Sequence, residues 1–423
     1  MELTNWARNV RFQPERFVRP RSVEHVQELV AGARRVRVLG TGHSFSEVAG
    51  TDGLLLGLAE LPLVVDVDST AATVRVSAGA RFGDVMGPLH AAGLALHNTG
   101  SLPHISVAGA CATGTHGSGS GNRCLAGSVV ELDLVGPDGA VRTVRAGEEG
   151  FDGSVVALGL LGVVTSLTLR ARPAFDVRQY VYDDLPLDAL LSGFDEVMDS
   201  AYSVSAFTRW RRPVIDMLWR KQLADAPEAP ASWLGAHLAD GPRHPVAGMP
   251  TENATQQLGV PGPWHERLPH FRLEFTPSSG DEVQTEYLLP REQAVAAVAA
   301  VAAVRETIAP ALHVSEIRTV AADDLWLSPA YGRPTVALHF TWVDDAAQVD
   351  RAVAALERAL ADLEARPHWG KVFGAGRERV RAMYPRLADF EALVRRHDPE
   401  GRFANAFTAR YLDVGTTTTT LPR

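Results

Sequence analysis

The chain has 423 residues, 46% of them hydrophobic, so it can bury a large core and is expected to divide into two domains. Its formal net charge of −9, from 41 basic and 50 acidic residues, gives no electrostatic reason to expect nucleic acid or an anionic membrane as a partner. Cys111 and Cys124 are too few for a disulfide framework or a four-thiolate metal site. Residues 1–6 lack the features of a signal peptide and no apolar run reaches about 18 residues, so a cytoplasmic protein without a membrane span is expected.

The first part of the chain alternates amphipathic helices with short strands. Residues 20–33 are predicted to form a helix with one apolar face, and a β-type segment then ends in the turn Gly40-Thr41-Gly42-His43-Ser44-Phe45. Strands are expected at 54–58, 64–68 and 73–76, the last two as a hairpin, followed by a helix at 81–92. A second hairpin at 129–145 and a strand at 163–172 complete an α+β unit.

The pattern changes near residue 173. Residues 186–200 are predicted as a helix and 203–210 as a strand, whereas the Pro- and Gly-rich segment 224–263 is expected to be an irregular loop. From residue 271 the predicted order is strand, helix 291–308, strands 313–320 and 336–343, and helix 348–365. The low-complexity tail 415–423 is expected to be disordered.

The turn at residues 40–45 presents two glycines with one residue between them. Such spacing lets backbone N–H groups converge on an anion such as a pyrophosphate, although a plain structural turn explains this stretch equally well. The Gly-x-Gly-x-x-Gly dinucleotide fingerprint fails here, because its last position is Phe45 and no helical pattern follows directly. His43 is the distinctive residue, since a phosphate cradle alone needs no imidazole beside its glycines.

Residues 98–121 form a second glycine-rich region in which small residues alternate with hydroxyl side chains. A loop of this kind lets a flat or phosphorylated ligand lie against the backbone. His104, His116 and Cys111 occur in this region, but their spacing matches no familiar set of metal ligands, so no metal site is expected.

Polar residues recur at a spacing of two on the later predicted strands. Glu316 and Arg318 leave the same face of one strand, and His339 and Thr341 repeat this arrangement on another. An ordinary cross-strand ion pair would also explain the first two residues. With Lys371 added from a following loop, the set suits a polyol, because each hydroxyl needs a donor or an acceptor.

Taken together, these segments resemble the vanillyl-alcohol-oxidase-type flavoproteins. The similarity extends over nearly the whole chain and is greatest to the alditol oxidases of that family. It rests on Gly40 to Ser44, the 100–119 region, Gly162-Val163-Val164-Thr165, 261–269, Glu316-Ile317-Arg318, His339-Phe340-Thr341-Trp342 and Pro367-His368-Trp369-Gly370-Lys371. The resemblance implies an α+β two-domain flavoprotein, with an FAD-binding domain at 1–173, an inserted substrate domain at 174–375, and a segment at 376–423 that returns to the FAD domain.

The resemblance also implies which residues hold the cofactor and the substrate. FAD is expected to be bonded covalently through its 8α methyl group to His43. The other implied cofactor positions are Gly40, Thr41, Gly42, Ser44, Phe45, Ser101, Ser106, Gly109, Ala110, Thr113, Gly114, Thr115, His116, Gly117, Val164 and Asn405, the last on a C-terminal strand. The implied substrate contacts are Ser101, Glu316, Arg318, Thr341 and Lys371, with His339 close by.

The expected activity is oxidation of the terminal primary alcohol of alditols such as xylitol and sorbitol to the aldose, with O₂ reduced to H₂O₂. Lys371, or a water that it holds, is the favoured base. Arg318, a poor base, is expected to lower the pKa of the substrate hydroxyl or of the reduced flavin by proximity, and Glu316 is expected to fix the position of Arg318 and of the sugar hydroxyls. An aldonolactone oxidase or dehydrogenase of the same family and a non-enzymatic sugar-binding protein are the alternatives. A monomer is expected.

Overall fold

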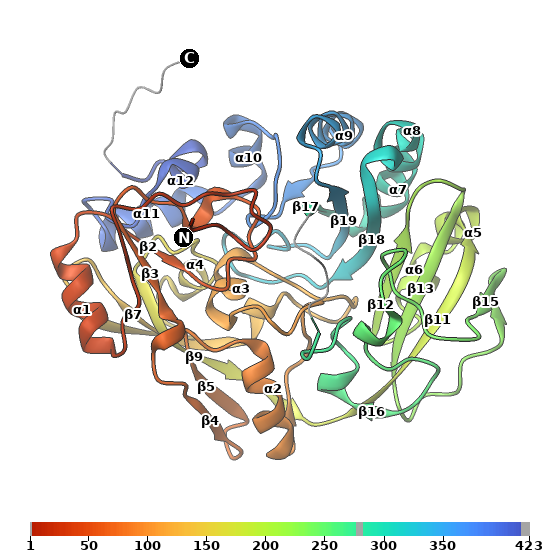
Figure 1. The fold of residues 1–423 in the computed structure, drawn as a ribbon, viewed down its shortest axis with the longest axis horizontal. Coiled ribbons are helices and arrows are strands. Elements are labelled where there is room, and N and C mark those ends of the chain that lie inside the picture. Colours follow the sequence, from red (N-terminus) through yellow and green to blue (C-terminus); the bar gives the residue numbers. More distant parts are fainter. Residues whose placement is uncertain (1, 276–281, 416–423) are drawn as a thin grey trace.

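The computed structural model describes residues 2–275 and 282–415, so the predicted disorder of the tail lies almost wholly outside the described residues. Figure 1 shows the N-terminal part of the chain, in red to yellow, beside the C-terminal helices in blue. The middle of the chain, in green to cyan, occupies the other side of the molecule.

Two sheets form the centre of the N-terminal half. Within the described residues, the first is parallel, in the order β1 (Arg16–Val18), β3 (Leu54–Gly57), β2 (Val36–Leu39). The second is antiparallel, in the order β4 (Val65–Asp68), β5 (Thr73–Ser77), β9 (Val163–Arg170), β7 (Val129–Val135), β8 (Val141–Arg145). Both predicted hairpins are confirmed, because β4 pairs with β5 and β7 with β8. A short ribbon of β6 (Leu94–Ala95) and β10 (Arg172–Pro173) lies beside them.

The helices predicted in this half are confirmed. In α1 (Val23–Gly32), the Ser22 hydroxyl caps the first turn by accepting from the His25 N–H at 3.2 Å. In α2 (Phe82–Ala91), the Asp84 carboxylate accepts from the Arg81 N–H at 2.9 Å. A further short helix is α4 (Phe151–Ser154). The glycine-rich region was predicted as a loop throughout, which is wrong, because it contains α3 (Val107–Thr113).

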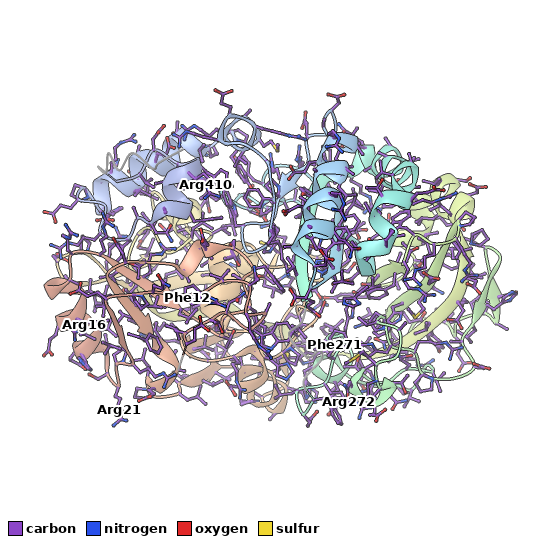
Figure 2. The ribbon with its side chains drawn as sticks, turned by 45° about the horizontal axis from the view of Figure 1, so that its top comes forward. Phe12, Arg16, Arg21, Phe271, Arg272 and Arg410 are labelled. Carbon is purple, nitrogen blue, oxygen red and sulfur yellow. The ribbon has the colours of Figure 1, made fainter. Side chains whose placement is uncertain are left out.

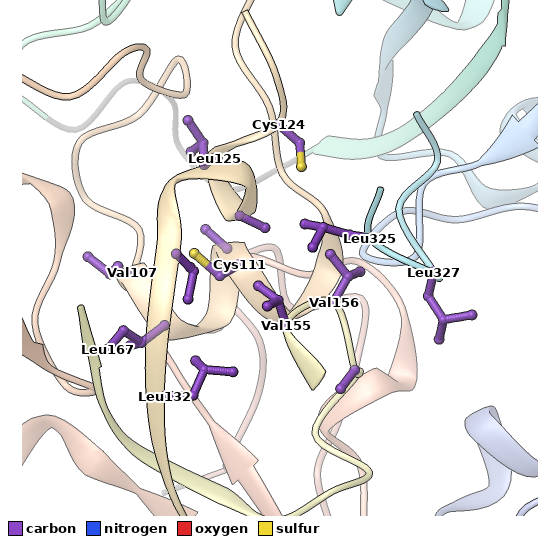
Figure 3. Close-up of a cluster of buried hydrophobic side chains, with 14 of the residues drawn as sticks. Val107, Cys111, Cys124, Leu125, Leu132, Val155, Val156, Leu167, Leu325 and Leu327 are labelled. Carbon is purple, nitrogen blue, oxygen red and sulfur yellow. The ribbon is translucent and has the colours of Figure 1, made fainter. Parts of the chain in front are cut away.

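Helix α3 is fixed by the apolar side chains that it buries. Val107 and Cys111 lie four residues apart and therefore on one face, where they pack in a cluster with Leu132 of β7 and Leu167 of β9 (Figure 3). In the sequence, the glycines and hydroxyl residues of this stretch obscure these two apolar positions. Its opposite face, which carries Gly109, is left open for a ligand.

The middle of the chain forms one large antiparallel sheet. Its order is β14 (Ser232–Trp233), β15 (Ala236–Leu238), β11 (Asp176–Pro186), β13 (Val214–Leu223), β12 (Ser203–Thr208), β18 (Leu312–Val320), β19 (Thr335–Val343), β17 (Glu282–Pro290), β20 (Arg366–Pro367), with β16 (Gly262–Pro263) on β11. One face packs in a hydrophobic core with α5 (Leu187–Ser192), α6 (Phe194–Met198), α7 (Ala294–Ala303), α8 (Arg305–Ile308) and α9 (Ala346–Ala359).

Several predicted boundaries in this half are wrong. The helix expected at 186–200 is two helices, because Gly193 leaves the helical conformation with φ −130° and ψ 41°. The segment 224–263 is not irregular throughout, since it contributes β14, β15 and β16. The strand expected from residue 271 begins, among described residues, at Glu282, and the helix expected at 348–365 is α9, which ends at Ala359.

The helix expected at 291–308 is bent. The break falls at Val304, whose φ of −101° and ψ of 9° are not helical. Among residues 2–275 and 282–415, no single helix is long and apolar enough to cross a membrane. The segments Arg291–Ala303 and Arg305–Ala311, bent by 60°, meet that length and composition test only as a pair.

The last helices join the N-terminal half, as Figure 1 shows. Phe390 and Phe407 are buried in the same core as β7 and β9, and they belong to α11 (Leu387–His397) and α12 (Ala406–Tyr411), which follow α10 (Arg377–Met383). The buried Arg37 side chain strengthens this contact by donating to the carbonyl oxygens of Phe403 at 2.7 Å and Leu158 at 2.6 Å. The C-terminal segment therefore packs against the N-terminal sheets, while the exact domain boundaries stay a prediction.

Candidate active site

A cavity of about 420 Å³ lies between the two halves of the molecule. Its lining includes the turn at residues 40–45, one face of α3, and side chains of β17, β18 and β19. Phe12 and Phe271 both line it, and Figure 2 labels Phe12 in the N-terminal half and Phe271 near the middle of the molecule. The two glycine-rich regions and the polar strand residues, which are far apart in sequence, thus face one cavity.

The turn at residues 40–45 keeps its backbone open to this cavity. A Cβ atom on Gly40 would lie 2.5 Å from Ser106 Oγ, so no larger residue fits without displacement. Gly42 has φ +72°, a conformation that favours glycine. The Thr41 hydroxyl oxygen accepts from the Ser106 N–H at 3.1 Å and so joins the two glycine-rich regions. The exposed N–H groups of this backbone can bind a diphosphate. The residues of the turn therefore fit the pyrophosphate of FAD.

His43 projects an uncharged imidazole into the cavity. Its Nδ1 atom lies 3.0 Å from Thr41 Oγ1, and its ring stacks on Trp6 with 5.5 Å between centroids. Burial, together with the charges of His104 and Lys371, lowers the pKa of His43 to about 4. The ring is therefore neutral at physiological pH and keeps the free electron pair that a nucleophile needs.

Most of the predicted cofactor positions line the cavity. They are Gly40, Thr41, Gly42, His43, Ser44, Phe45, Ser101, Ser106, Gly109, Ala110, Thr113, Thr115, His116 and Val164. Gly114, Gly117 and Asn405, although described by the structure, are not among the lining residues. Gly114 ends α3, and a Cβ atom on Gly117 would lie 2.3 Å from the Thr99 carbonyl oxygen, so both are explained by local packing.

Asn405 was predicted on a C-terminal strand, which is wrong. It is the N-cap of α12, where its side-chain oxygen accepts from the Thr408 N–H at 2.8 Å. Its amide nitrogen donates to the carbonyl oxygens of Glu47 and Val48 at 3.1 Å and of Gly50 at 2.8 Å. Asn405 thus braces, from behind, the segment that follows the 40–45 turn.

Three adjacent strands bring the polar side chains of the other half together. Their antiparallel register pairs His339 of β19 with Glu286 of β17 on one side and with Glu316 of β18 on the other. Gln284, Arg318 and Thr341 lie two residues away on the same strands and therefore share the face that lines the cavity. The predicted substrate residues Glu316, Arg318, His339, Thr341 and Lys371 all line it, as does Ser101 from the other half.

Glu286 is the site residue that sequence reasoning missed. Its Oε1 atom lies 3.3 Å from His116 Nε2 and 3.5 Å from His339 Nδ1, and the carboxylate accepts a hydrogen bond from Arg318. Burial would raise the pKa of Glu286, but the charges of Arg318, His116 and His339 hold it well below its usual value. The alternation Gln284-x-Glu286 before a buried strand end was the available signal, since it repeats the spacing of Glu316 and Arg318.

Lys371 reaches the cavity from the segment that follows β20 and runs beside β17. Its Nζ atom donates to the Gln284 side-chain oxygen and lies 5.0 Å from the centroid of the Phe45 ring. The Phe45 N–H donates to the Gly370 carbonyl oxygen at 2.7 Å, so the lysine segment is tied directly to the 40–45 turn. Burial lowers the pKa of Lys371 to about 8 against the opposing charge of Glu286, so an appreciable fraction is neutral near physiological pH.

Replacing Glu286 by glutamine should destabilise the protein by about 3 kcal/mol, because it breaks a buried ion pair and leaves the Arg318 charge less compensated. Chemical denaturation measures this loss. Glu282→Gln is the matched control, since Glu282 lies on the same strand and cavity face but is less buried, and a change below about 1 kcal/mol is expected there. Equal losses in the two variants would contradict a central role for Glu286.

Comparison with known proteins gives matches along the whole chain. Residues 14–145 match the family described as FAD binding domain, and residues 281–411 match D-arabinono-1,4-lactone oxidase. The chain is 52% identical to an alditol oxidase from Streptomyces sp. over 97% of this chain and 99% of that protein. It is 30% identical to an L-gulono-1,4-lactone dehydrogenase from Mycobacterium tuberculosis, over 97% and 98% of the two chains.

A solved structure of cholesterol oxidase from B. sterolicum has a similar fold. It superposes with a TM-score of 0.78 over 97% of this chain and 96% of its own, at 16% sequence identity. At that identity the likeness concerns the fold alone. The α+β arrangement of a flavoprotein-type half and a large antiparallel sheet is therefore shared with a known oxidase fold.

Proposed function

The chain belongs to the vanillyl-alcohol-oxidase-type family of FAD-linked oxidases that includes alditol oxidase, and from this premise we propose that it oxidises the terminal primary alcohol of alditols to the aldose. Electrons pass to O₂, which yields H₂O₂. The observation that carries the proposal is the polar face of β17, β18 and β19, which meets Lys371 and Ser101 in the same cavity as the 40–45 turn.

This polar face matches the chemistry of a polyol. Glu286, Glu316 and Gln284 offer acceptors, whereas Arg318 and Lys371 offer charged donors, so consecutive hydroxyls can each find a partner. Buried sites of this kind reject analogues that lack a hydroxyl, because a protein group is then left unpaired. An acyclic chain of hydroxyls is therefore suited to this face.

The residues of the 40–45 turn and of the open face of α3 would hold FAD. When bound, this cofactor accepts a hydride from the terminal carbon and is reoxidised by O₂. We place its covalent attachment at His43, because the imidazole there is neutral, is oriented by Thr41 and Trp6, and faces the cavity. Lys371 is our choice of base for the hydroxyl proton, since its pKa of about 8 is near the working pH.

Glu316 and Arg318 position the substrate rather than take its proton. Although burial alone would raise the pKa of Glu316, Arg318 and His270 hold it below its ordinary value, so Glu316 is an anion and a hydrogen-bond acceptor. Arg318 lies between Glu286 and Glu316 and stays charged. Its charge also favours the alkoxide character that develops as the hydroxyl proton leaves.

An aerobic peroxide assay tests the proposal. Purified protein, yellow with flavin that stays with the acid precipitate, should form H₂O₂ with xylitol or sorbitol and much less with an aldonolactone. The lactone is the second candidate substrate, favoured by the match of residues 281–411 to D-arabinono-1,4-lactone oxidase. Peroxide from the lactone alone would select that activity, and colourless protein after supply of FAD would leave only a sugar-binding role.

A further inference from the structure

Lysine is rare in this chain and occurs only twice. Of 41 basic residues, Lys221 and Lys371 are the only lysines, and the rest are arginine. Arginine serves wherever a permanent charge is enough, whereas lysine offers a compact ammonium group with three donors. Lys371 has its role in the cavity. Lys221, with 1% of its surface exposed, lies behind the cavity wall and has no role in the mechanism so far.

The Lys221 side-chain nitrogen lies within hydrogen-bond distance of three acceptors. Its Nζ atom lies 2.6 Å from the Leu268 carbonyl oxygen, 3.0 Å from that of Pro269 and 3.0 Å from His270 Nδ1. In its protonated form, Lys221 has three N–H donors for these three acceptors. The Glu316 carboxylate, 2.9 Å from His270 Nε2, can only accept a hydrogen bond, so the proton of the neutral imidazole is on Nε2 and Nδ1 accepts from Lys221.

This tautomer directs a donor at a substrate residue. His270 Nε2 lies 2.9 Å from Glu316 Oε1, while the other carboxylate oxygen of Glu316 lies 3.7 Å from Arg318 Nε. The backbone of His270 reaches the opposite side of the cavity, because its N–H donates to the Ser101 carbonyl oxygen at 3.1 Å. One residue therefore connects Glu316 on the large sheet with Ser101 on the cofactor side.

We propose that Lys221 and His270 are positioning residues, which form a buried chain from Lys221 through His270 to Glu316 and hold the Glu316 carboxylate in one orientation toward the polyol hydroxyls. The polyol part of this inference rests on the proposed function. The chain of contacts and the histidine tautomer do not depend on it.

The charges around His270 allow its contact with Lys221 to be tested through the pKa of His270. Burial and the positive charges of Lys221 and Arg318 lower the pKa of His270 to about 4, and only Glu316 opposes them. The rings of Phe207, Trp219 and Phe271 cover the remaining sides. Burial also lowers the pKa of Lys221 itself well below its usual value, against the charge of Glu316. At the acid pH where His270 titrates, replacing Lys221 removes one of the two positive charges that lower the pKa of His270, so this pKa should rise.

The first experiment measures the tautomer and the pKa of His270 directly and needs no substrate. In the wild-type holoenzyme, ¹⁵N NMR of selectively labelled histidine should show His270 neutral at pH 6 and protonated on Nε2. In Lys221→Met, the pKa of His270, measured by C2–H exchange and mass spectrometry, should rise by about one unit or more. Arg220→Met is the control, because Arg220 neighbours Lys221 on β13 but bonds Ser200 instead. The opposite tautomer in the wild type would overturn the proposal, as would an unchanged pKa in Lys221→Met.

The second experiment reads the effect on substrate binding. Lys221→Met should raise KM for the best alditol about tenfold with a smaller effect on kcat, and its kcat/KM should fall at acid pH through the raised pKa of His270. Lys221→Gln, which keeps an N–H donor for Nδ1 without the charge, should recover part of the KM and also serves if the methionine variant does not fold. Folded variants with wild-type KM and an unchanged pH profile would remove the positioning role. Absence of peroxide in the wild type would instead reject the proposed function. The tautomer measurement would still test whether Lys221, His270 and Glu316 are connected as proposed.

Discussion

Replacing Lys371 by methionine is expected to lower kcat by about 10²- to 10⁴-fold, the usual contribution of a positioned base, while the flavin stays attached. The reason is that Lys371 combines cavity placement, attachment to the 40–45 turn through Gly370, and a pKa lowered by burial to about 8. In the wild type, kcat/KM should rise with pH through about 8, because the amine must lose its proton before it can accept another. Stopped-flow measurement of flavin bleaching under anaerobic conditions isolates this step.

Lys371→Arg separates the role of a base from that of a charge. Arginine can still donate to Gln284 and stays protonated throughout the accessible pH range, so it should bind substrate without restoring the rate. The rise of kcat/KM near pH 8 should vanish in both variants. Near-normal reduction rates in Lys371→Arg would show that the lysine supplies only charge and that the proton leaves by another group.

Local patterns predicted the parts of the fold that depend on nearby residues. Helices α1 and α2 and both hairpins follow from apolar spacing, caps and turn residues that lie within a few positions of one another. Strands β11 and β13 were not predicted. They lie inside the large sheet, where burial on both faces removes much of the alternation that marks a strand. Strand β13 also carries the buried Lys221, and lysine is a residue type that is normally found at the surface.

The site shows the same division between local and distant information. His43 was predicted because it directly follows two closely spaced glycines, and Glu316 and Arg318 were predicted because they lie two residues apart. Glu286 and His270 did not, because their roles come from partners 32 and 46 residues away, Arg318 and Glu316 respectively. The pairing of β17, β18 and β19 places Glu286 beside Arg318, and the fold of the segment before β17 places His270 against Glu316.

Replacing His43 by alanine is expected to abolish covalent flavin attachment altogether and to leave at most dissociable FAD, with lower activity. The physical reason is that His43 is the neutral imidazole that Thr41 and Trp6 orient toward the cavity, and alanine offers no nucleophile in its place. Acid precipitation followed by an absorbance spectrum of pellet and supernatant measures the bound fraction. The wild-type pellet should be yellow and the variant pellet colourless.

His104→Ala is the matched control for this loss. His104 is a second imidazole close enough to lower the pKa of His43 by its charge, but its Nε2 atom bonds the Leu273 carbonyl oxygen at 2.8 Å and it does not appear among the described cavity-lining residues. Its removal should leave the flavin covalently bound. Because the turn at 40–45 is held by backbone contacts from Trp6 and Gly370, the alanine variant at position 43 should still fold and bind FAD reversibly. Covalent flavin that survives His43→Ala would mean that another side chain forms the bond.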